Sequence, residues 1–369
     1  MSATILNSAT NVSPKSTKKK FLNSVNYFRG IAIILIVLGH SYELAGWDLP
    51  HSWQEVGLAA QLFYSASVNG SVYFIFISGF LYYHIFYKRF NYGKFMNKKL
   101  QYVLLPYLLI SIVPIAYKVL SGDVDSYTPA VVGDQPLALA SWYLFGGRLN
   151  YAYWYIPMAM LLFAISPIIN IVIKYKKSLF VALLLLPISL IVHRSVANIN
   201  HIQSLIYFLP VYFLGIWSSR HHQQILHYLK SNRSKLALAA IALGFGLIQV
   251  VLFNYAGNSH KEFWAVTVPD VNLLQKIALC FLFLAVLDLW ENKELPIIKK
   301  TAETSFAIYF LHPFVGNLLY KITSDLNISY QGNLFTLLLA TVVMVVTSMG
   351  IAMGIKGVLG KKSRYLIGW

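Results

Sequence analysis

The sequence reads RGIAIILIVLGHSYE from residue 29 to residue 43, within an apolar run that extends from 27 to 44. A helix that crosses the hydrocarbon core of a bilayer needs about 20 largely apolar residues. This run approaches that length, and its interior carries no charged side chain. We therefore expect it to form a transmembrane helix.

The composition of the whole chain extends this expectation. Of 369 residues, 57% are hydrophobic and only 12% are charged, whereas about 25% of the residues of a soluble domain are charged. So few charges cannot cover the surface of a water-soluble globule. The composition therefore excludes a soluble enzyme, a nucleic-acid-binding domain and a disordered chain. It favours a multi-pass membrane protein whose outer surface contacts membrane lipids.

Ten apolar runs are candidates for membrane spans, which predicts an all-α transmembrane helical bundle of about ten spans. Their ranges are 27–44, 68–87, 102–120, 152–173, 179–193, 202–218, 236–254, 273–289, 304–320 and 334–356. The fifth and sixth runs are short, so a re-entrant or a tilted helix fits them equally well.

The basic residues give an independent view of the topology. The chain has 30 Lys+Arg against 13 Asp+Glu, a net charge of +17. If the chain begins in the cytoplasm, all but six of these cations fall on the cytoplasmic side, as the positive-inside rule requires. The six exceptions are Lys118, Arg148, Arg194, Lys261, Lys276 and Lys321. We therefore expect both termini to be cytoplasmic, with a basic tail at 1–26, a transmembrane domain at 27–356 and a short tail at 357–369.

Metal and nucleotide signatures do not occur in the sequence. Cys280 is the single cysteine, so the chain cannot form an internal disulfide. The histidines at 221, 222 and 227 fall in a basic loop without paired carboxylates or cysteines, and we predict no metal site there. No phosphate-binding loop, dinucleotide fingerprint or zinc signature is present.

Two ionisable residues stand out in the first predicted helix. Arg29 and His40 are eleven residues apart, which is about 16 Å and three turns, so both lie on nearly the same face. A buried imidazole is neutral, as a general base must be. The alternatives are an arginine that anchors the helix at the interface and a histidine bonded by a neighbouring helix. Glu43, three residues after His40, either orients the ring or lies in water at the outer end of the helix.

At this point the sequence resembles the acyltransferase 3 family of integral membrane acyltransferases. The family's hallmark is an arginine followed, after ten intervening residues, by a histidine in the first helix. The sequence RGIAIILIVLGH at 29–40 is especially similar to the fucose 4-O-acetylase-like branch. The stretches that agree in order are FIFISGFLYY at 74–83, KFMNKKLQYVLLPY at 94–107, YWYIPMAML at 153–161, FLPVYFLGIW at 208–217 and IYFLHPF at 308–314.

This resemblance implies an O-acyltransferase, most simply an O-acetyltransferase, in a bacterial-type inner (plasma) membrane. Its donor would be acyl-CoA (acetyl-CoA) as a co-substrate, with no permanently bound cofactor. The acceptor would be a sugar hydroxyl of a cell-surface polysaccharide or its lipid-linked precursor, and glycan-synthesis machinery is an expected partner. The alternatives are a polysaccharide or lipid-linked sugar exporter without acyl-transfer activity, and a structural partner of a glycan synthase.

The resemblance also assigns a donor site and a reacting group. A polyanionic donor that enters from the cytoplasm would meet Arg29, Lys98 and Lys99. Family members commonly have arginines in the segment that here contains Lys98 and Lys99, and lysine lacks the bidentate fork of arginine; both lysines also fit as topology anchors. His40 would act either as general base or as nucleophile.

The remaining candidates each have a structural alternative. Ser78 would stabilise the thioester oxyanion, or else its Ser-Gly pair serves close helix packing. His312 would contact substrate, or else bond backbone freed by Pro313. The aromatic rings of Trp154 and Tyr155 would stack on a sugar, or else they belong to an interfacial aromatic belt. Arg148 would bind acceptor hydroxyls, or else it is a solvated loop residue.

Overall fold

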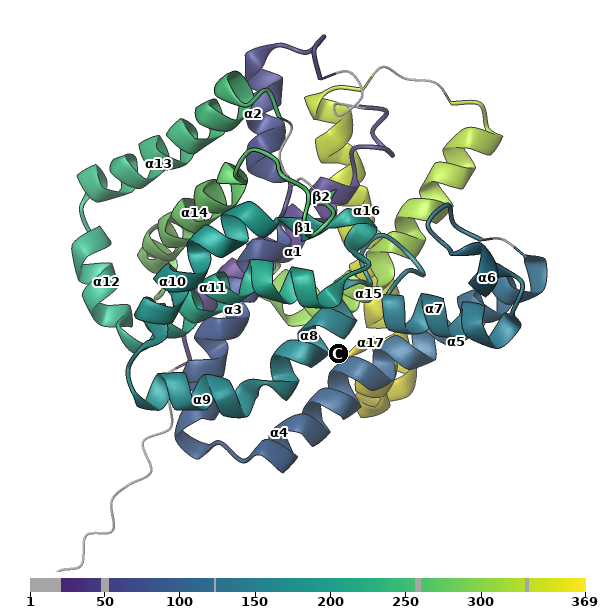
Figure 1. Ribbon diagram of the computed structural model, residues 1–369, viewed down its shortest axis with the longest axis horizontal. Coiled ribbons are helices and arrows are strands. Elements are labelled where there is room, and N and C mark those ends of the chain that lie inside the picture. Colours follow the sequence, from purple (N-terminus) through teal and green to yellow (C-terminus); the bar gives the residue numbers. More distant parts are fainter. Residues whose placement is uncertain (1–20, 48–52, 123, 256–259, 329–331) are drawn as a thin grey trace, which may run out of the picture.

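The chain forms a bundle that is almost entirely helical (Figure 1). The computed structural model describes residues 21–47, 53–122, 124–255, 260–328 and 332–369. The α-helices are α1 (Asn23–His40), α2 (Leu58–Ser67), α3 (Ser71–Leu81), α4 (Tyr92–Lys99), α5 (Leu105–Ser121), α6 (Ala130–Gly133), α7 (Pro136–Gly146), α8 (Tyr155–Ala164), α9 (Ser166–Lys174), α10 (Ser178–Val192), α11 (His201–Arg220), α12 (His222–Leu229), α13 (Asn232–Leu247), α14 (Val271–Leu287), α15 (Pro296–Asp325), α16 (Leu334–Leu359) and α17 (Ser363–Ile367).

Short elements complete the fold. Single π-helical turns adjoin α3, α5 and α13; they are η1 (Tyr82–Phe86), η3 (Leu100–Leu104) and η5 (Ile248–Leu252). The 3₁₀ turns are η2 (Tyr87–Arg89), η4 (Val196–Asn198), η6 (Asp288–Trp290) and η7 (Gly360–Lys362). In the described part of the chain, the strands are β1 (Arg194–Ser195) and β2 (His260–Lys261), which pair in parallel.

The all-α membrane fold is confirmed, and each of the ten predicted runs is helical over most of its length. Within the described residues, six helices are long and apolar enough to cross a membrane. A seventh span results if α8 and α9, which meet at a bend of 54°, are counted together. The total of ten spans and the cytoplasmic position of both termini stay predictions.

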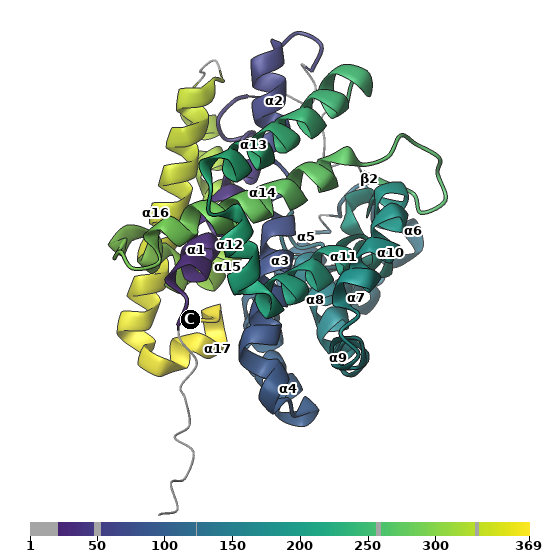
Figure 2. The same cartoon turned by 90° about the vertical axis from the view of Figure 1, so that its left-hand side faces the viewer.

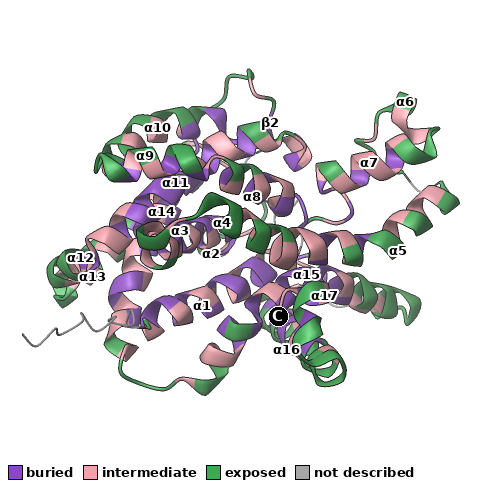
Figure 3. Cartoon of the chain, turned by 90° about the horizontal axis from the view of Figure 1, so that it is seen from below, coloured by how far each residue is buried: buried purple, intermediate pink, exposed green. Residues whose placement is uncertain are grey.

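The outer helices carry large apolar side chains on their exposed faces (Figure 3). On α10, Phe180, Leu184 and Ile191 are 61%, 58% and 63% exposed. Helices that are apolar all round belong in a membrane, where lipid covers such a face. The inner helices α1, α3 and α11 instead bury most of their side chains against one another and against α14 and α15.

The helical segment that contains α2 and α3 is broken between the two helices. Val68 is extended and Asn69 has a left-handed backbone, with φ 59°. The break frees carbonyls at the end of α2, which need other partners in a membrane. The ammonium of Lys276 donates to the carbonyls of Ser65 and Ala66 at 2.8 and 2.6 Å, and Asn272 donates to the Ser65 carbonyl at 2.9 Å. These α14 side chains therefore stabilise the break.

Helices α3 and α11 cross at two glycines. A Cβ atom on Gly79 would overlap with the backbone of Tyr212, and one on Gly215 would overlap with the backbone of Phe76. Small residues allow this close approach of helices in a membrane. Gly79 is the glycine of the Ser-Gly pair, so the packing explanation holds for the glycine. Figure 2 shows α3 in the interior of the bundle, with α2 above it and α4 below it.

We expect Gly79→Ala to lower the thermal stability of the detergent-solubilised protein. The added methyl group meets backbone that cannot turn away, and overpacking of this kind costs about 1–3 kcal/mol. The matched control is Gly244→Ala on α13, where a Cβ atom would meet nothing within 4 Å. That variant should melt at or slightly above the wild-type temperature, because alanine favours helix. Equal melting temperatures for the two variants would contradict the glycine crossing.

Candidate active site

His40 is the last residue of α1 and lies where two cavities meet. The first cavity has a volume of about 360 Å³ and the second of about 270 Å³. Among the described residues, both cavities are lined by Ile36, His40, Ser71 and Trp154. A group bound in either cavity can therefore reach the same imidazole.

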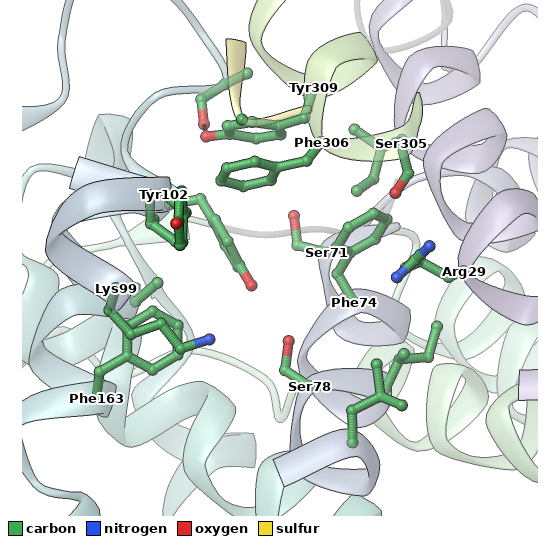
Figure 4. Close-up of a pocket in the computed structure, with 18 of the residues that line it drawn as sticks. Arg29, Ser71, Phe74, Ser78, Lys99, Tyr102, Phe163, Ser305, Phe306 and Tyr309 are labelled. Atoms are coloured by element: carbon green, nitrogen blue, oxygen red, sulfur yellow. Dashed lines mark hydrogen bonds between the residues drawn. The ribbon is translucent and has the colours of Figure 1, made fainter. Parts of the chain in front are cut away.

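The first cavity is cationic. Arg29, Lys98 and Lys99 line it, together with a fourth cation, Arg364. Figure 4 shows Arg29 and Lys99 on opposite sides of the cavity, with Ser71 and Ser78 between them. Since Arg29 and His40 both line this cavity, the prediction that they share one face of α1 is confirmed.

Two of these cations are held by neighbouring helices. The Arg29 guanidinium donates through Nε to the Ala302 carbonyl of α15 and through Nη2 to Asn26 Oδ1, both at 3.0 Å. The Lys99 ammonium lies 4.2 Å from the centre of the Phe163 ring. Cations over aromatic rings are stabilised by the negative ring face. Both charges are thus held at fixed positions beside the cavity.

Hydroxyl groups and aromatic rings form the rest of the first cavity. Ser78 and Tyr155 line it and lie within hydrogen-bonding contact of each other. The rings of Phe74, Phe306 and Tyr309 line it as well. The cavity thus combines positive charge with an apolar wall and a few hydroxyl donors.

The second cavity is polar. Its lining includes the guanidinium groups of Arg148 and Arg194 and the amides of Asn69, Asn150 and Asn198. None of the described residues that line it is acidic. The Asn69 amide oxygen is buried without a hydrogen bond in the described structure. This cavity therefore presents hydrogen-bonding groups suited to a polar molecule.

Arg194 is positioned by the short parallel sheet. It lies in β1, whose partner β2 comes from the connection between α13 and α14. Its guanidinium donates to Asn198 Oδ1 at 2.7 Å and lies 4.5 Å from the centre of the Trp154 ring. Burial lowers the pKa of Arg194 to about 10. The side chain therefore keeps its positive charge at neutral pH.

Two rings lie against His40. The Tyr151 ring centre is 4.4 Å away and the His312 ring centre is 5.6 Å away. Nδ1 of His312 is 3.0 Å from the Ile308 carbonyl, and because a carbonyl only accepts, Nδ1 carries the proton in this hydrogen bond. Its Nε2 is buried without a partner in the described structure. The His40 imidazole is thus confined between aromatic neighbours.

The structure brings most of the predicted site residues together. Those that line the first cavity are Arg29, His40, Ser78, Lys98, Lys99, Trp154 and Tyr155. Arg148 lines the second cavity, where it also pairs with Asp125 at 3.3 Å. His312 lines neither cavity and lies behind His40. Trp154 is only 4% exposed and stacks on Phe208, so an interfacial belt does not describe it.

The helical relation expected between Glu43 and His40 is wrong, whereas the alternative of a Glu43 side chain in water agrees with its exposure. The helix ends at His40, and residues 41–46 form turns. Because the helical spacing stops there, Glu43 does not follow His40 on a helix face; it is exposed and lines neither cavity. We assign it no catalytic role.

Several residues of the site were not predicted from the sequence. Arg194, Asn69 and Asn150 line the second cavity but lie in or beside connections between helices. One sequence signal pointed to Arg194, since it is among the six cations that break the charge rule. The two asparagines carry no comparable signal.

One comparison with known proteins identifies a family. The model of the acyltransferase domain family, acyltransferase 3, matches residues 22–353. No curated protein and no solved structure matches the chain. The fucose 4-O-acetylase-like branch stays a prediction.

The charge of the first cavity can be tested with thiol reagents. On a Cys280→Ala background, Ser78→Cys should react faster with an anionic than with a cationic methanethiosulfonate, because the surrounding cations concentrate anions. Relative to the exposed control Ser324→Cys, we expect a preference of about tenfold that shrinks at high salt. The measurement is the pair of labelling rates at each position. The same anion-to-cation ratio at both positions would refute a cationic cavity.

Proposed function

The chain belongs to the acyltransferase 3 family of membrane acyltransferases, and from this premise we propose that it transfers an acetyl group from acetyl-CoA to a sugar hydroxyl. The acceptor is a cell-surface polysaccharide or its lipid-linked precursor, met at a bacterial-type plasma membrane beside the glycan-synthesis machinery. The observation that carries the proposal is the position of His40, which lines both cavities. Two substrates that both reach one catalytic group are held close enough to react with each other.

The first cavity suits the donor. Coenzyme A carries several phosphate charges at one end and a thioester at the other, joined by a flexible arm. The cations Arg29, Lys98 and Lys99 provide charge-assisted contacts for the phosphates. The distance of about 16 Å along α1 from Arg29 to His40 is suited to an extended arm. The apolar wall excludes competing water from the thioester.

The second cavity suits the sugar. Sugar hydroxyls need closely placed donors and acceptors, and the arginines and asparagines of this cavity supply both. Tyr151 and Trp154 offer apolar surface beside them. Loss of a hydroxyl that pairs with such buried polar groups is costly, which favours specificity for one sugar position.

The chemistry at His40 follows one of two routes. As general base, neutral His40 takes the proton of the acceptor hydroxyl while its oxygen attacks the thioester carbonyl. As nucleophile, a His40 nitrogen first receives the acetyl group and then passes it to the hydroxyl. In both routes the carbon–sulfur bond breaks and coenzyme A leaves as a thiol. In the general-base route its sulfur takes up the hydroxyl proton by way of His40; in the nucleophilic route it takes up the imidazole proton, and the hydroxyl proton later returns to the imidazole. Ser78 and Tyr155 are the hydroxyl donors available to the carbonyl oxygen as negative charge develops on it.

The proposal predicts a specific loss of activity in His40→Ala. Radiolabelled acetyl transfer from acetyl-CoA to glycan, measured in membranes with matched protein amounts, should fall by about 10²–10⁴-fold, because a proton-transfer or nucleophilic group is lost. Binding of acetyl-CoA should change little, since the cations of the first cavity remain. The control is His227→Ala, an exposed histidine outside both cavities, which should retain wild-type transfer.

A second measurement identifies the acceptor. Mass spectrometry of surface glycans from cells with and without the protein should show loss of an acetyl group from one sugar.

Activity of His40→Ala within a few-fold of wild type would remove His40 from the mechanism. Intact glycan acetylation together with failed glycan export in cells lacking the protein would replace the proposal with a transporter.

A further inference from the structure

The segment after α16 turns back onto the bundle. Gly360–Lys362 form a 3₁₀ turn, and α17 then packs against α5, α15 and α16. Figure 1 shows α17 beside α5 and α15, the helices that it contacts. This segment was predicted to be a short tail, and it lies beyond residue 353, where the family match ends. Its role therefore cannot be read from the family match.

Several contacts hold this segment in place. Ile367 is 1% exposed and packs in one cluster with Ala307 of α15 and Ala352 of α16. The ammonium groups of Lys356 and Lys300 lie 3.6 and 5.1 Å from the centre of a Trp369 ring. These contacts join apolar burial to cation–π attraction, so residues 363–369 have a defined position on the bundle.

The docked segment forms part of the wall of the first cavity. Arg364 and Gly368 line the cavity, and Gly368 lies directly against the Phe306 ring. The Arg364 guanidinium lies 3.9 Å from the centre of the Tyr102 ring. Phe306 and Tyr102 line the same cavity. Arg364 is exposed, which suits a residue at the mouth of the cavity.

We propose that Arg364 binds a phosphate group of the acyl-CoA donor and that residues 363–369 complete the donor site. The inference rests on the proposed function. Lys98 and Lys99 stand where the family commonly has arginines, and a lysine binds phosphate only as a point charge. Arg364 supplies the planar fork at the same cavity, from a different segment of the chain.

The test compares two neutralised cations of the same segment. Arg364→Gln should raise the dissociation constant of acetyl-CoA about tenfold, as expected for loss of a charge-assisted contact. The matched control is Lys362→Gln, which removes the same charge from an exposed residue outside the cavity lining and should stay within twofold of wild type. Arg364→Lys should recover part of the affinity. All four proteins are measured by calorimetry in the same detergent.

Donors with fewer phosphates separate binding from packing. With S-acetylpantetheine, which has no phosphate, Arg364→Gln and wild type should bind equally. With acetyl-dephospho-CoA, a vanished difference assigns Arg364 to the 3′-phosphate, and a retained difference assigns it to the pyrophosphate.

The outcomes distinguish this inference from the proposed function. If wild type binds acetyl-CoA and Arg364→Gln binds it equally well, the inference on Arg364 is wrong and the proposed function stands. The inference is also wrong if the loss of affinity persists with S-acetylpantetheine, because the contact is then not with phosphate. If wild type does not bind acetyl-CoA, the proposed function fails and this inference fails with it.

Discussion

A helix that breaks inside a bilayer must find other partners for the carbonyls it frees, and the site depends on how this chain meets that requirement. Lys276 and Asn272 bond the carbonyls at the end of α2. The end of the α2 dipole is negative, so a buried ammonium is favourable there. Because the break is stable, Asn69 and Ser71 reach the cavities beside His40 instead of continuing a helical ladder.

Four of the six cations outside the predicted cytoplasmic side share a physical explanation. Arg148 and Arg194 line the second cavity, and Lys261 and Lys276 are 6% and 0% exposed. An arginine or lysine on the translocated side or in the membrane costs free energy. Each of these four is tied to a defined partner: a carboxylate, an amide oxygen or backbone carbonyls. Exceptions to a topology rule are therefore a productive place to search a membrane protein for polar sites.

The long apolar helices were predictable because a bilayer accepts apolar segments of sufficient length. The Arg29–His40 face was predictable because helical geometry is regular between those residues. The end of α1 was not, since the apolar run continues to Leu44 and no glycine or proline at 41–44 marks a stop. The positions of Arg194 and Arg364 at the cavities were not predictable either. Arg194 is positioned by the pairing of β1 with β2 across a long sequence separation, and Arg364 by the folding back of α17. Long-range packing of this kind leaves no local pattern.

The meeting of the two cavities at His40 affects the electrical insulation of the membrane. If the two cavities open to opposite sides of the membrane, water enters the protein from both faces. Among the described residues, Ile36, His40, Ser71 and Trp154 then form the lining that the cavities share, and they replace some 30 Å of hydrocarbon as insulator. The side chains that allow transfer of an acetyl group between the cavities must therefore block the flow of protons and ions between them. Otherwise catalysis would discharge the membrane potential.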